Sequence, residues 1–217
     1  VLAPNLDRMG PSLLNSLANI LQRTTDKPKW LDTAIDHEKE SMLAGVQFVQ
    51  NAYVSQDYKL LQDQLGNEVR EAIEYFKQLR GQGSDRQMAY FAGFAKEADT
   101  ELAWVREQAA LPVQQRKPME FPDGTSRPWR RFSKHFFRTL RPLLDKQART
   151  EARTRLMILE CRILAQIKSS GAAPIDLSAY PVALTTDPFT GKPFSYESDG
   201  PAFKLYSPGP DFIDNGG

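Results

Sequence analysis

The residues best suited to chemistry lie in the last fifty positions of the chain, where turn residues, aromatic residues and acids recur at fixed places. Asp187 opens one turn-rich segment, and Asp211 and Asp214 bring two carboxylates together near the end. Carboxylate oxygens bind hard cations, but acids in loops also accept hydrogen bonds from their own backbone. We interpret Asp187 as a turn residue, and both interpretations stay open for Asp211 and Asp214.

No other group of residues has the spacing of a catalytic or metal site. The run His37-Glu38-Lys39-Glu40 lacks the second histidine, four positions after the first, that a zinc protease needs, so we interpret it as a solvated helix face. Cys161 is the only cysteine and lies in an apolar stretch, so we expect a buried thiol. The sequence contains neither a nucleophile elbow nor a phosphate-binding glycine loop. We therefore expect that the protein is not an enzyme.

One stretch carries a local excess of positive charge. Between Arg116 and Arg155 there are twelve basic residues against four acidic ones, although the whole chain has a net charge of +1. Aromatic residues interleave with these cations. Such a segment is most often the solvated face of an amphipathic helix, but it can also bind anionic lipid or, less often, nucleic acid. The candidate binding residues are Arg127, Arg130, Arg131, Lys134, Arg138 and Arg141.

The composition is ordinary for a globular protein, with 41% hydrophobic and 25% charged residues. The 217 residues suffice for one large domain or two small ones. No apolar run approaches the roughly 20 residues that a membrane-spanning helix needs. Because the chain starts at Val1 rather than Met, we expect an upstream segment, either a signal or a membrane anchor.

The first half of the chain has the apolar spacing of helices joined by short turns. This pattern predicts an N-terminal helical bundle over residues 1–111. Four prolines and Asp123-Gly124 then predict a loop over 112–128, which is the best candidate domain boundary. The expected helices of the bundle cover residues 11–23, 30–56, 58–80 and 84–110.

The third predicted region covers residues 129–217. It begins with a helix over 129–169, in which Pro142 is the position of an expected bend. Asp199-Gly200 between two alternating aromatic segments predicts a hairpin, and a lone hairpin needs a covering helix. The predicted fold is therefore mainly α, with the N-terminal helical bundle followed by a long helix packed on a small C-terminal antiparallel β-sheet.

Two motifs in this region resemble a known family. The first runs Asp187-Pro188-Phe189-Thr190-Gly191-Lys192-Pro193-Phe194-Ser195-Tyr196, and the second runs Leu205-Tyr206-Ser207-Pro208-Gly209-Pro210-Asp211. Together with the helix and the Gly171-x-x-Pro174 break before them, they resemble the periplasmic part of the major pseudopilin of type II secretion. The resemblance covers residues 146–217, about a third of the chain. The same ending after a helical region is similar to that of a set of proteins from planctomycetes and related bacteria.

The resemblance implies a calcium site in the terminal loop. Major pseudopilins hold calcium there through backbone carbonyls and later aspartates. Carried over by position, the candidates are Leu205 and Ser207 by carbonyl, and Asp211 and Asp214 by carboxylate. Calcium takes about six to eight oxygen ligands of this mixed kind. The alternative is that both aspartates are turn residues.

The resemblance also implies a function and a location. We expect a non-enzymatic bacterial envelope protein on the periplasmic or extracellular side, with protein partners in a secretion-like or cell-surface assembly. The helices before residue 112 have no counterpart in a pseudopilin, so we expect them to form an interaction module. No prepilin leader or hydrophobic helix is present in the sequence, which departs from the family. The alternative is an adaptor that binds anionic lipid or nucleic acid through the basic helix over 127–155.

Overall fold

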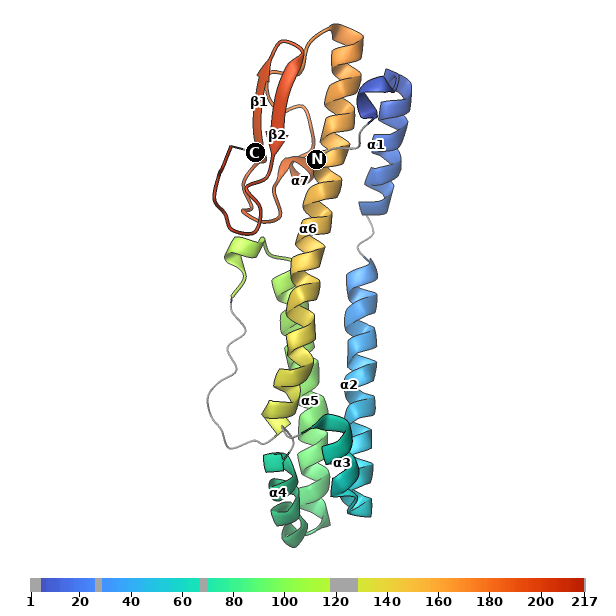
Figure 1. Cartoon of the computed structure of the whole chain (residues 1–217), viewed down its shortest axis with the longest axis vertical. Helices are drawn as coiled ribbons and strands as arrows, with labels where there is room; N and C mark the ends of the chain where they lie inside the picture. The colour runs from blue at the N-terminus through green and yellow to red at the C-terminus, as the bar shows by residue number, and fades with distance from the viewer. Residues whose placement is uncertain (1–4, 26–28, 67–69, 118–128, 217) are drawn as a thin grey trace. The chain divides into compact units, whose positions relative to one another are not determined.

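The computed structural model describes residues 5–25, 29–66, 70–117 and 129–216. This part of the chain is mainly helical and carries one two-stranded antiparallel sheet near the C-terminus (Figure 1), which confirms the predicted fold class. No helix in the described ranges is long and apolar enough to cross a membrane.

The contacts divide the chain into two compact units, each built from separate pieces of sequence. Unit 1 consists of Val1–Lys29, Ala109–Arg116 and Leu144–Gly217, and unit 2 consists of Trp30–Gln108 and Lys117–Leu143. The boundaries of these units differ from the ranges 1–111, 112–128 and 129–217 that the sequence predicted. An N-terminal piece and a short piece of the expected loop belong with the C-terminal region, because their apolar side chains pack there.

Unit 2 is an all-helical structure around an aromatic core. Tyr53, Phe76 and Phe91 come from three different helices, and their ring centroids lie 5.6 to 6.1 Å apart. Two exposed ion pairs, Lys39–Asp99 and Arg106–Asp36, also link the helix over Lys29–Ser55 to the helix over Ser84–Ala109. Exposed pairs contribute little, so the buried rings hold the unit together. Its helices are α2 (Lys29–Ser55), α3 (Tyr58–Leu65), α4 (Arg70–Leu79), α5 (Ser84–Ala109) and the first part of α6 (Trp129–Ser170), up to Leu143, with a 3₁₀ turn, η3, over Arg80–Gln82.

The structure divides the helix that was predicted over 58–80. Helix α3 ends at Leu65, and Gly66 follows with a φ of +75°. A glycine in the left-handed region is a common helix stop, because a side chain is strained there. Helix α4 begins only at Arg70. Helix α6 (Trp129–Ser170) continues through Pro142, the position of the expected bend.

Unit 1 is built on the C-terminal part of α6. One face of this helix supplies Ile158, Leu159 and Ile163 to the core, all of them fully buried. Helix α1 packs on that core through Leu14 and Ala18. The elements of unit 1 are η1 (Leu6–Arg8), α1 (Pro11–Thr25), η4 (Val113–Gln115), α6 (Trp129–Ser170, of which Leu144–Ser170 belongs here), α7 (Val182–Thr185), β1 (Ser195–Asp199) and β2 (Ala202–Tyr206).

The hairpin also packs on the core of unit 1. Strands β1 and β2 pair antiparallel, with Tyr196 opposite Leu205 and Asp199 opposite Ala202, so the turn lies at Gly200-Pro201. Gly200 has a φ of +59°, which the turn requires. Tyr196, Phe203 and Leu205 pack against the α6 core beside the buried Phe194. The predicted hairpin and its covering helix are confirmed.

Candidate functional site

Asp187 organises the first motif segment. Its side chain is completely buried, and its Oδ1 accepts a hydrogen bond from the Phe189 amide at 3.0 Å. The Thr190 hydroxyl donates to its Oδ2 at 3.2 Å, and the Gly191 amide donates to its carbonyl at 2.8 Å. Buried carboxylates need such donors. The interpretation of Asp187 as a turn residue is confirmed.

The same carboxylate joins the first motif to the second. The Ser207 hydroxyl donates to Asp187 Oδ2 at 3.0 Å and accepts from the Gly209 amide at 3.1 Å. These contacts tie the turn after Pro188 to the loop after β2. The two motifs named from the sequence are therefore one structure, and its centre is a buried acid that the sequence analysis had placed only in a local turn.

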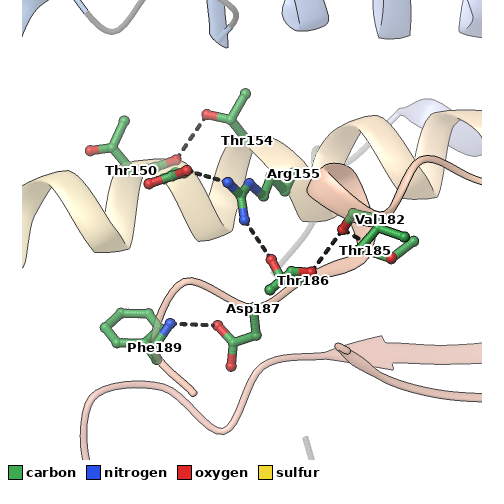
Figure 2. Close-up of polar contacts among 9 residues, drawn as sticks. Thr150, Thr154, Arg155, Val182, Thr185, Thr186, Asp187 and Phe189 are labelled. Atoms are coloured by element: carbon green, nitrogen blue, oxygen red, sulfur yellow. Dashed lines mark hydrogen bonds and ion pairs between the residues drawn. The ribbon is translucent and has the colours of Figure 1, made fainter. Parts of the chain in front are cut away.

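Helix α6 holds this structure through one arginine. Figure 2 shows Arg155 reaching from α6 to the residue before Asp187, where its Nη1 donates to the Thr186 carbonyl at 2.6 Å. Its Nη2 pairs with Glu151 one turn earlier on the helix. Arg155 is partly buried, so this contact fixes the turn relative to the helix better than an exposed pair would.

A short piece of the expected loop also binds the Asp187 turn. The Val113 amide donates to the Pro188 carbonyl at 2.9 Å, and the Gln114 amide donates to the Phe189 carbonyl at 2.8 Å. Val113 packs in a small apolar cluster with Ala148, Ala152 and Phe189. We call residues 112–116 the strap. Sequence reasoning missed it, because prolines mark a loop without saying what the loop contacts.

The candidate calcium ligands lie in or beside the terminal loop. Leu205 and Ser207 are partly buried, whereas Asp211 and Asp214 are exposed. Asp211 Oδ1 accepts from the Ile213 amide at 3.2 Å, and Asp214 Oδ1 accepts from the Gly216 amide at 2.9 Å. Both aspartates thus make the local turns that were the alternative interpretation. Both turns use the Oδ1 atom of the aspartate.

The charge of Asp214 bears on its candidate role as a calcium ligand. The hydrogen bonds from the Gly216 amide and the Tyr206 hydroxyl hold the pKa of the Asp214 carboxyl below its usual range. The carboxylate is therefore ionised across the neutral pH range. Within the described ranges, no three His, Cys, Asp or Glu side chains group as a metal site, so a cation here would depend on carbonyl oxygens.

The basic candidates are described only in part. Arg127 lies outside the described residues. The other five, Arg130, Arg131, Lys134, Arg138 and Arg141, lie on the helical backbone of α6. Their helical spacing, with steps of three or four residues between Arg131, Lys134, Arg138 and Arg141, places these four on one face.

Two other groups bear on chemistry. Cys161 is completely buried, which confirms the expected buried thiol. Desolvation, and after it the charge of the neighbouring Glu160, raises the pKa of this thiol to about 11. Glu160 is 7% exposed, and its Oε2 has no hydrogen-bond partner in the described structure. Desolvation raises the pKa of this carboxyl to about 7. The sequence signal was an acid between Leu159 and Cys161, inside an apolar helix face.

Comparisons with known proteins add no relative. No family model matches the chain, and neither the curated proteins nor the solved structures include a match.

Proposed function

We propose that this chain is a non-enzymatic bacterial envelope protein whose C-terminal part is a pseudopilin-like module in a secretion-like or cell-surface assembly. The supporting observation is the contact between Ser207 and Asp187. It joins the two motifs that carry the resemblance into one structure, which packs on the end of a long helix. The assignment of function still rests on the resemblance, because a shared module does not fix a role.

The proposal includes calcium in the terminal loop. The ligands would be the carbonyls of Leu205 and Ser207 and the carboxylates of Asp211 and Asp214. The donor set fits in kind, because it mixes two carboxylates with backbone carbonyls in a loop. When bound, calcium would bring the two exposed aspartates together and tie the loop to the end of β2.

Thermal melts with calcium or a chelator test this site. Calcium that binds only the native state stabilises it by about 2.7 kcal/mol at a concentration of 100 times Kd, which raises Tm by several degrees. We expect this rise in the wild type and its loss in Asp211→Asn/Asp214→Asn. The matched control is Glu197→Gln/Asp199→Asn, which changes two exposed acids of the hairpin and should keep the full rise. If calcium raises Tm equally in the two double variants, calcium is no longer part of the proposal.

The assembly role needs a separate test. Genes for a secretion ATPase or a prepilin peptidase beside the gene of this protein would support it. Cross-linking in the native cell should then capture components of that assembly through the C-terminal module. If cross-linking recovers only cytoplasmic proteins, the envelope proposal is wrong, whatever the calcium melts show.

The adaptor alternative is favoured by one observation, the continuous helical backbone of α6 under its basic residues. Binding to vesicles with and without phosphatidylserine tests the adaptor alternative. Binding that needs the anionic lipid, falls steeply with salt and is lost in Arg131→Gln/Arg138→Gln would favour the adaptor. Absence of binding at low salt would exclude the lipid version, and duplex DNA tested in the same buffers addresses nucleic acid.

A further inference from the structure

Met88 is the most exposed methionine in the part of the chain that the structure describes. It is 61% exposed, whereas Met42 is completely buried. Met9 and Met157 are partly buried. A peroxide oxidises a thioether by reacting directly with the sulfur atom, so the rate follows access to that atom. Of these four side chains, that of Met88 is therefore the most open to oxidation.

A hydrogen bond ties the sulfur of Met88 to a neighbouring helix of unit 2. The Nε2 amide of Gln50, on α2, donates to Met88 Sδ at 3.8 Å. Met88 lies near the start of α5, and Figure 1 shows α2 and α5 side by side. A thioether sulfur is a weak acceptor, so this contact adds little in the reduced protein.

Oxidation replaces this weak acceptor with a stronger one. One lone pair of the sulfur accepts from Gln50, and the other is open to hydrogen peroxide. The peroxide transfers one oxygen atom to the sulfur: the S–O bond forms, the O–O bond breaks, and the remaining oxygen leaves as water with both hydrogens. The sulfur is oxidised and the peroxide is reduced, so no other reactant is needed. The polar sulfoxide oxygen then takes the place of the sulfur as acceptor for the Gln50 amide.

The position of Met88 tolerates the added polarity. A sulfoxide disrupts a core because it converts an apolar side chain into a polar one. Met88 lies outside the aromatic core cluster of unit 2, which includes Tyr53, Phe76 and Phe91. The same oxidation at the buried Met42 would place a polar group in the interior of the protein.

We propose that Met88 is a reversible oxidation site of unit 2, where a peroxide forms the sulfoxide and the Gln50 amide holds its oxygen. Oxidation turns an exposed apolar side chain into a polar one and strengthens the contact between α2 and α5, without opening the core. Methionine sulfoxide reductases, one for each sulfoxide epimer, restore the thioether. The inference does not depend on the envelope role or on calcium.

Limited treatment of the native full chain with hydrogen peroxide, followed by peptide mapping with mass spectrometry, tests the site. Met88 should form the sulfoxide at least about tenfold faster than Met42, and ahead of Met9 and Met157. After the peroxide is removed, the two reductases together should restore unmodified Met88. If Met42 reacts as fast as Met88, or if Met9 or Met157 reacts first, Met88 is not the oxidation site.

The role of Gln50 needs a readout other than the rate of oxidation. In the NMR spectrum, the side-chain amide signals of Gln50 should move when Met88 is oxidised. The Gln47 amide, which donates to Asn51 on the same helix, should not respond. In Met88→Leu, which has no sulfur at this position, the same peroxide treatment should leave the Gln50 signals in place.

Thermal melts of the singly oxidised protein complete the test. The oxidised wild type should melt no lower than the reduced wild type. In Gln50→Ala, oxidation should lower Tm by about 1 to 2 °C, because the sulfoxide has lost its donor. Gln47→Ala is the matched control and should respond to oxidation as the wild type does. If the Gln50 signals do not move, or if the two glutamine variants respond alike, Gln50 does not hold the sulfoxide and the proposal is wrong.

Discussion

The Ser207 hydroxyl donates a hydrogen bond of 3.0 Å to the buried carboxylate of Asp187, twenty positions earlier in the chain. This contact joins the turn after Pro188 to the loop after β2. Asp187 has two other side-chain acceptor contacts, from the Phe189 amide and the Thr190 hydroxyl. The Asp187 carboxylate therefore keeps two donors when Ser207 is replaced, whereas the Ser207 hydroxyl loses its acceptor when Asp187 is replaced.

This asymmetry predicts unequal costs of mutation. Asp187→Ala leaves three donors without their acceptor and should lower the free energy of unfolding by about 3 kcal/mol or more. Ser207→Ala removes one of the three and should cost about 1 kcal/mol. In the double mutant the two effects should fall short of additivity, because Ser207 has little left to bind once Asp187 is gone. Urea denaturation followed by circular dichroism measures all three.

Asp199→Ala is the control, since Asp199 is exposed in the hairpin and should change stability little. Full additivity of Asp187→Ala and Ser207→Ala would show that the contact does not form in solution.

The glycine that faces the strap gives a second prediction. Gly191 has a φ of +71°, and its added Cβ would meet Pro112 Cγ at 2.8 Å. Gly171 has a φ of +83° but open space around it. Alanine costs about 1 kcal/mol at either position because of the backbone, and only Gly191→Ala must also displace the strap. We expect Gly191→Ala to be the costlier variant by about 1 kcal/mol, with faster hydrogen exchange at the Val113 amide. Equal costs would mean that Pro112 moves away freely.

The elements that follow a regular period were predictable from sequence. Helices α1, α2 and α5 and the hairpin appear close to where apolar spacing and turn residues placed them, since these signals are local. The stop at Gly66 was also local, but one glycine inside a helical pattern gives a weak signal. The strap and the pairing of Ser207 with Asp187 were not predictable in this way. Both join irregular segments, and no period records which loop meets which.

The buried side chains of Cys161 and Glu160 show the same limit of prediction from sequence. The sequence placed Cys161 correctly inside the core, because a cysteine among apolar residues is usually buried. It gave no such expectation for Glu160, since an acid beside apolar residues is usually turned to solvent. Which face of α6 is covered depends on α1 and the hairpin, and that information is not contained in the helix itself.

The thiol of Cys161 should report the unfolding of unit 1. Burial raises its pKa to about 11, and the side chain is completely inaccessible. At pH 8 a disulfide reagent should therefore modify the native protein at least about a hundredfold more slowly than the urea-unfolded protein. Ligands that stabilise unit 1 should slow the native reaction further. Rapid labelling of the native protein would contradict the packing of Cys161 against the core.

Glu160 makes the stability of the protein depend on pH. Its pKa is about 7 in the folded protein, and the ordinary value of 4.5 applies when the chain unfolds. The folded state therefore binds more protons than the unfolded state between these two values. The stabilising contribution of the neutral carboxyl is fully present below about pH 4.5, falls as the pH rises toward 7, and is lost above it. The total loss is at most about 3.5 kcal/mol, since the pKa rises from 4.5 to about 7 and each pKa unit corresponds to about 1.4 kcal/mol.

Glu160→Gln tests this assignment, because the amide is nearly isosteric and does not titrate. The variant should lose the decline between about pH 4.5 and 7, and at pH 8 it should be more stable than the wild type. Glu197→Gln, which changes an exposed acid of the hairpin, should keep the wild-type profile. Urea denaturation at a series of pH values gives the free energy of unfolding directly. The same slope in Glu160→Gln and the wild type would show that another group titrates, and that the carboxyl of Glu160 reaches solvent.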